Sequence, residues 1–195
     1  MMSKEVIQLV MGRSNAGMPI LKTGEQAPIP VTTPNRYITG IPALNLPAPE
    51  GTTGDWHWST VFYNATDNNR HAIPLQLAGE GESLDTRHIY GQYGIYECSK
   101  AMMDIGLDIP KSMSNVYAAN HFRAILDMLY WSLIKYHRVI ALDGVTEDWL
   151  DSQEQKEFVL KKAAEMLPFL NNNDRDKLQD WISQERLPGY RSELP

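Results

Sequence analysis

The stretch GTTGDWHWST, residues 51–60, places an aspartate two residues before a histidine that is flanked by two tryptophans. In an extended strand Asp55 and His57 would share one face, where they could bind one metal ion or act as a general base with its orienting carboxylate. A structural hydrogen bond within a turn is the simpler alternative. Trp56 adds a side chain typical of protein interfaces. We expect the pair to brace the neighbouring proline-rich loop or to lie at the edge of a partner-binding site.

No second motif in the sequence supports catalysis or metal binding. The five histidines include no i,i+4 pair, and the sequence contains no HExxH or CxxC motif. A nucleophile elbow, a P-loop and a GxGxxG motif are also missing. The single cysteine, Cys98, stands in the apolar context IYECSKAM and is expected to be a core residue. The sequence therefore predicts no catalytic residue, no metal site and no cofactor.

Three polar residues recur along the most apolar stretch of the chain. Asn120, Arg123 and Asp127 fall at i, i+3 and i+7, on one side of a helix, where Arg123 and Asp127 can pair. Because the surrounding helix is so apolar, we expect this cluster to be partly buried, and buried charges need partners. A tie between the helix and the irregular loops is the favoured interpretation, since a guanidinium is well suited to binding backbone carbonyls. Recognition of a ligand is the alternative.

The segment DGVTEDWLDSQEQKE, residues 143–157, carries six acidic residues and only one base, Lys156. A solvated helix face is the ordinary interpretation of such a charge run. A docking surface for a basic protein is the alternative, with Asp148 among its charges and Trp149 as its anchor.

The composition fits a globular chain. Its 195 residues are 43% hydrophobic and 22% charged, which is enough to form a core without disulfides. One cysteine and the lack of a signal peptide or a membrane-length apolar run favour a cytoplasmic protein with no membrane association. The net charge of −6 argues against direct binding to nucleic acid, which requires cationic side chains to neutralise phosphates.

Prolines and glycines concentrate before residue 110, and long apolar periodicity follows it. Both residue types weaken regular helices, so the sequence predicts an α+β fold. A small antiparallel sheet and ordered loops over residues 1–110 would pack on a helical part over residues 111–195, within a single domain.

Individual elements follow from local patterns. In the first part we expect a short strand in RYITGI (36–41), an antiparallel hairpin over 56–79 and a helix within 83–110. In the second part a long central helix should run over 114–138 for about 35 Å, with Ser114 as its N-cap. One or two helices should follow within 146–170, capped at Thr146, and then a last helix capped near Asn173 or Asp174.

Two stretches together resemble a known group of proteins. They are RYITGIPALNLPAPEGTTGDWHW, residues 36–58, and VYAANHFRAILDMLYWSL, residues 116–133, about a fifth of the chain. They resemble small prokaryotic and mobile-element proteins that are encoded beside toxin genes and act as antitoxins. Antitoxins that bind operator DNA use a separate basic helical module, and this sequence shows no such module. The resemblance thus implies a protein partner, with nucleic-acid binding only as part of a complex.

We therefore expect a toxin-neutralising protein that sequesters a basic toxin enzyme. Its expected partner-binding residues are Asp55, Trp56, His57, Asp148 and Trp149. Two alternatives remain open. One is a small hydrolase or nucleotide-processing enzyme that brings Asp55, His57, His121 and Arg123 into one pocket. The other is a phage or plasmid accessory protein that inhibits a host factor.

Overall fold

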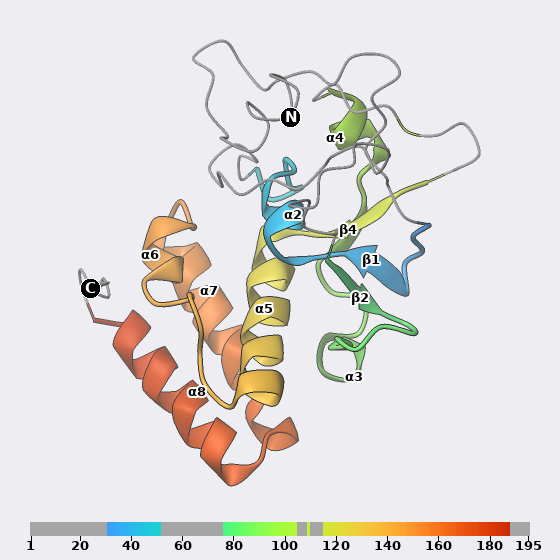
Figure 1. The fold of residues 1–195 in the computed structure, drawn as a ribbon. Helices are drawn as coiled ribbons and strands as arrows, with labels where there is room; N and C mark the ends of the chain where they lie inside the picture. The colour runs from blue at the N-terminus through green and yellow to red at the C-terminus, as the bar shows by residue number, and fades with distance from the viewer. Residues whose placement is uncertain (1–30, 52–75, 105–108, 110–114, 188–195) are drawn as a thin grey trace, which may run out of the picture. The chain divides into compact units, whose positions relative to one another are not determined.

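The computed structural model describes residues 31–51, 76–104, 109 and 115–187. These residues form two compact units, whose helices and strands are labelled in Figure 1. The first unit comprises the described residues up to Asp85 together with Gln92–Ala124. The second comprises Thr86–Gly91 and the described residues from Ile125 onward. Strands lie in the first unit and most helical residues in the second, so the fold is α+β, as predicted.

A four-stranded mixed sheet organises the first unit. The strands are β1 (Arg36–Ile38), β2 (Leu77–Gly79), β3 (Ile95–Glu97) and β4 (Tyr117–Ala119), in the order β2-β1-β4-β3. β1 pairs with β2 antiparallel and with β4 parallel, and β3 pairs with β4 antiparallel. The two central strands therefore have ladder partners on both sides.

The predicted short strand in RYITGI is confirmed as β1. It continues into α2 (Gly40–Leu44). β2 lies at the end of the hairpin expected over residues 56–79, and its described partner is β1. The rest of the expected hairpin, including residues 56–63, lies outside the described residues.

The prediction of a helix within residues 83–110 was wrong for the middle of this stretch, which contains a strand. The described part of this stretch contains α3 (Arg87–Tyr90), then β3, then α4 (Ser99–Asp104). Gly91 and Gly94 both have positive φ, at 56° and 74°, which ends helical geometry before β3 begins. Tyr96 consequently lies in a strand rather than in the expected helix, and Met103, in α4, is 56% exposed.

The long central helix, α5, runs over His121–Tyr136 rather than 114–138, for about 24 Å. Residues Tyr117–Ala119, expected in its first turns, instead form β4 and pair with two strands. Ser114 is therefore not its N-cap. That role belongs to Asn120, whose Oδ1 accepts a hydrogen bond from the Arg123 amide at 2.8 Å.

The second unit is helical throughout its described elements. After α5 come α6 (Val145–Asp148), α7 (Gln153–Ala164), the 3-10 turn η1 (Leu167–Phe169) and α8 (Asn172–Glu185). Its core gathers apolar side chains from α5, α7 and α8, namely Ile125, Leu126, Leu129, Leu133, Val159, Leu160, Ala163, Leu178, Trp181 and Ile182. The Trp181 indole N–H donates to the carbonyl of Leu142 at 2.8 Å, so even the polar atom of the largest core residue is satisfied.

Two of the predicted helix caps were misplaced by a few residues. α7 begins after Ser152, whose hydroxyl accepts from the Gln155 amide, and α8 begins after Asn171, whose Oδ1 accepts from the Asp174 amide. Thr146 lies inside the first turn of α6, and the N-cap of that helix is Gly144. Asn and Ser are both good caps, so local preference allowed several neighbouring starts.

Candidate protein-binding site

The partner-binding residues predicted from the sequence fall in two places. Asp55, Trp56 and His57 lie outside the described residues. Asp148 is the last residue of α6, and Trp149 follows it, half-buried, with its amide donating to the carbonyl of Val145 at 2.9 Å. The candidate site is accordingly built around α6 and the start of α7, within the acidic segment 143–157.

The position of α6 is fixed by a buried carboxylate from the far end of α8. Glu185 is 1% exposed and accepts hydrogen bonds from the amide of Gly144 at 2.5 Å and from the amide of Thr146 at 3.0 Å. The Thr146 hydroxyl donates to it as well, at 2.5 Å. A four-residue helix would not hold itself together, because nucleating a helix is costly. The carboxylate satisfies its free N-terminal donors and favours its dipole.

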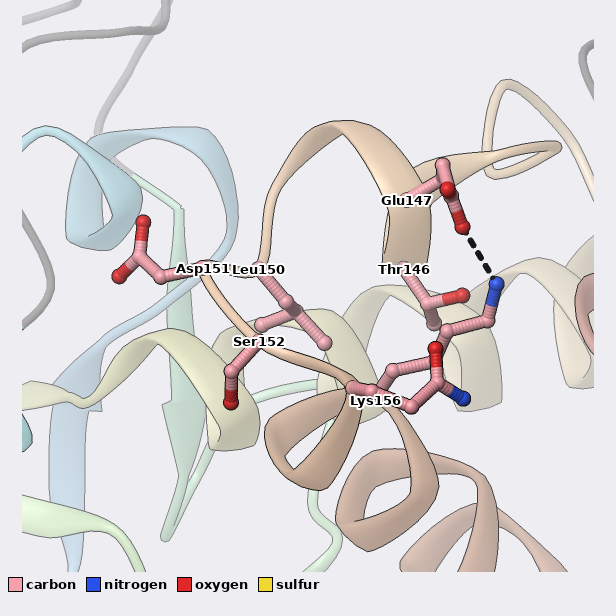
Figure 2. Close-up of a pocket in the computed structure, with 7 residues that line it drawn as sticks. Thr146, Glu147, Leu150, Asp151, Ser152 and Lys156 are labelled. Carbon is pink, nitrogen blue, oxygen red and sulfur yellow. Dashed lines mark hydrogen bonds and ion pairs between the residues drawn. The ribbon is translucent and has the colours of Figure 1, made fainter. Parts of the chain in front are cut away.

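The one base of the acidic segment is turned inward. The side chain of Lys156 is 6% exposed, and its Nζ lies 2.6 Å from Oε2 of Glu147. Figure 2 shows the two side chains directed at each other across the gap between α6 and α7. Glu147 therefore neutralises an ammonium that solvent scarcely reaches, and Lys156 contributes no positive charge to the outer surface.

The outer surface of this segment is consequently acidic. Asp143, Asp151 and Glu154 are exposed, and within the described part of the chain none of the three has an ion-pair partner. Glu157 is also exposed and lies 3.7 Å from Arg186, a distance that gives a weak surface pair. We call the exposed carboxylates of Asp143, Asp151 and Glu154 the acidic face.

A shallow cavity of about 230 Å³ opens beside the acidic face. Figure 2 shows its labelled lining residues, which come from α6, the connection to α7 and the first turns of α7: Thr146, Glu147, Leu150, Asp151, Ser152 and Lys156, with Gln153 also lining it. Small-molecule pockets typically measure about 300–1,000 Å³ and are mostly apolar. This cavity is smaller and mostly polar, which suits one side chain of a protein partner better than a cofactor.

The three polar residues predicted on α5 are all buried. Arg123 is fully buried, and its guanidinium donates to the carbonyl of Tyr93 and to the hydroxyl of Tyr37, each at 2.8 Å. Asn120 caps the helix, and its amide donates to the Glu50 carboxylate. Asp127, in the second unit, accepts from the Thr86 hydroxyl. These contacts are structural ties from α5 to turns and loops.

His121 and Arg123, expected in one pocket if the protein were an enzyme, are both 0% exposed. His121 Nε2 lies 2.8 Å from the carbonyl oxygen of Leu46, in the proline-rich stretch after α2. Gly94 fits tightly against the same turn of α5, because a Cβ there would meet Asn120 Oδ1 at 2.6 Å. Asp55 and His57 lie outside the described residues, so this alternative gains no support from the described contacts.

The Glu50 carboxyl, which accepts a hydrogen bond from the Asn120 side chain, makes the stability of the fold depend on pH. Partial burial of the carboxyl raises its pKa above the ordinary value of 4.5. The folded state therefore holds the Glu50 proton more tightly than the unfolded state, and this contribution to stability is lost as the pH rises from 4.5 through the folded pKa. We expect Glu50→Gln to flatten the dependence of the unfolding free energy on pH just above 4.5, measured by urea unfolding at a series of pH values. An unchanged slope in the variant would show that Glu50 does not titrate abnormally.

Cys98 is a core residue, as expected. It is fully buried, and burial, with a smaller contribution from the charge of Glu97, raises the pKa of its thiol to about 12. A thiol with so high a pKa is a poor nucleophile at neutral pH.

Glu185 is the functional-site residue that the sequence interpretation missed. Its partners, Gly144 and Thr146, are about 40 residues away in the chain, so no local pattern marks it. Within the described ranges, no group of three or more His, Cys, Asp or Glu side chains is arranged to hold a metal ion. None of the helices described is both long enough and apolar enough to span a lipid bilayer.

The fold and the site together define an α+β protein with an acidic surface built on a short, externally anchored helix. Comparison of the chain with protein-family models, with curated proteins and with solved structures found no match.

Proposed function

We propose that this protein binds a protein partner with a basic surface through the acidic face and Trp149. One observation carries the proposal: the only base of the segment, Lys156, is buried and paired with Glu147, which leaves the outward charge negative. A solvated helix face is the ordinary interpretation of an acidic run, but the inward position of Lys156 leaves this run without an exposed base of its own. A negative surface next to a half-buried tryptophan is suited to steering and then anchoring a basic partner.

The resemblance to antitoxins supports a more specific proposal, in which the partner is a toxin enzyme. Binding would then neutralise the toxin by covering its active site. Enzymes that act on nucleic acid present basic surfaces, which the acidic face complements. The cavity beside Asp151 would receive one side chain of the partner.

The test begins with the identity of the partner. The tagged full-length chain is used to capture stoichiometric partners from its native host, and the complex is then reconstituted from purified components. We expect Asp151→Asn/Glu154→Gln to lower the association rate at low salt by about tenfold. Because steering is electrostatic, the difference should shrink at high salt.

The matched control is Asp176→Asn/Asp180→Asn, which removes two exposed acids from α8 instead. It should leave the association rate nearly unchanged. Equal association rates for both double variants, with both still folded, would contradict the role of the acidic face. For the toxin proposal, growth is followed with the partner expressed alone and together with the protein. Equal toxicity in both cultures, or a partner without toxicity, would rule that proposal out.

A further inference from the structure

The C-terminal end of α5 carries a second charged surface, which the proposed function does not use. Lys135 and Arg138 are exposed there, next to Tyr136, which is 48% exposed. Among the described residues neither Lys135 nor Arg138 has an ion-pair partner. We call Trp131, Lys135, Tyr136 and Arg138 the basic end.

Two aromatic rings hold the ammonium of the basic end in place. Lys135 Nζ lies 4.5 Å from the centre of the Trp131 ring and 5.3 Å from the centre of the Tyr136 ring. Both distances are within the range of a cation–π interaction. The ammonium is therefore positioned without being neutralised, so less side-chain entropy is lost when it meets a carboxylate.

The imidazole of His137, next to Tyr136 in the chain, contacts Asp174 instead of adding to the basic end. Its Nδ1 lies 3.1 Å from each carboxylate oxygen of Asp174, which is buried. Asp174 therefore faces His137, and within the described part of the chain it pairs with neither Lys135 nor Arg138, so the basic end keeps its exposed positive charge.

The basic end and the acidic face lie at opposite ends of the second unit. In Figure 1 the last turn of α5 lies in the lower part of this unit, and the chain then runs upward to α6 near its top. The acidic face begins at Asp143, just before α6. A protein with opposite charges at its two ends can join copies of itself head to tail.

We propose that the basic end of one copy binds the acidic face of a second copy. Lys135 and Arg138 would meet the carboxylates of Asp151 and Glu154, and Tyr136 would supply the apolar contact. This inference rests on the proposed function for one of its two surfaces. It adds a way to regulate self-association. A basic partner and a second copy compete for the acidic face, so binding of the partner dissociates the assembled copies.

The first experiment measures self-association of the full-length chain by sedimentation velocity over a range of concentrations. We expect concentration-dependent association at about 0.1 M salt and its loss near 1 M, where charges are screened over a few ångströms. Lys135→Glu/Arg138→Glu should abolish the association at low salt. Asp151→Lys/Glu154→Lys should abolish it as well, because either variant places like charges on both surfaces.

The second experiment mixes the two charge-reversed variants. Neither should associate alone, but their mixture should, since each reversed surface then meets one of opposite charge. Restoration in the mixture also excludes misfolding as the reason for either loss. The single variant Lys135→Glu is compared with a matched control, Lys100→Glu. Lys100 lies outside the basic end, and its side chain is 81% exposed. The control should associate like the unaltered chain, and Lys135→Glu should associate several-fold more weakly.

A chain that stays monomeric at every concentration, or a mixture of variants that fails to associate, would overturn the inference. Aromatic and cationic side chains together can also bind single-stranded nucleic acid, and an oligothymidylate probe tests for that ligand. Binding of that probe, lost in Lys135→Glu, by a chain that does not self-associate would assign the basic end to single-stranded nucleic acid instead. None of these failures affects the proposed function, which is measured with the purified partner.

Discussion

Glu185→Ala is expected to lower the free energy of unfolding by about 3 kcal/mol. The carboxylate is 1% exposed and accepts three hydrogen bonds from Gly144 and Thr146. Removing it leaves those donors buried without an acceptor, and the missing atoms leave a cavity. The measurement is equilibrium unfolding in urea, followed by circular dichroism and by tryptophan fluorescence.

The same substitution should weaken partner binding, because α6 and Trp149 lose their anchor. Glu185→Gln should cost less than the alanine variant, since one amide oxygen can still accept while the NH₂ group opposes a donor. Asp180→Ala, an exposed site on the same helix, should change stability by less than about 0.5 kcal/mol. A Glu185→Ala protein as stable as Asp180→Ala would refute the anchoring role.

Arg123→Ala is expected to destabilise the protein by about 4 kcal/mol. The guanidinium is fully buried and ties α5 to the carbonyl of Tyr93 and the hydroxyl of Tyr37. It also lies over the Tyr37 ring, 5.4 Å from its centre. Arg123→Lys should recover only part of the loss, because a single ammonium does not reproduce the planar fork that reaches both partners.

The contribution of one contact can be separated from the others. Tyr37→Phe keeps the ring and removes the hydroxyl, so it should cost about 1 kcal/mol. A double-mutant cycle with Arg123→Met and Tyr37→Phe measures the coupling between the two side chains. Coupling near zero would show that the Arg123–Tyr37 hydrogen bond does not contribute to stability. A loss below about 1 kcal/mol for Arg123→Ala would show that Arg123 is not a structural tie.

The sequence alone determined the fold class and the character of α5. Prolines and glycines before residue 110 disfavour long helices, and the described helices of that part are short, whereas apolar periodicity after it indicates the long helices that are found there. The positions of Asn120, Arg123 and Asp127 on so apolar a helix indicated their burial, and all three are buried. These conclusions hold because helix period and backbone preference are local properties of the chain.

Only the tertiary structure decided where α5 begins and what holds α6. Tyr117–Ala119 continue a helical pattern, yet they form β4 because strands on both sides offer ladder partners. Lys156 could not be distinguished from a solvated lysine until its pairing with Glu147 was seen. Glu185 reaches α6 across about 40 residues of sequence, and contacts between such distant residues leave no periodic or capping pattern that local physics can interpret.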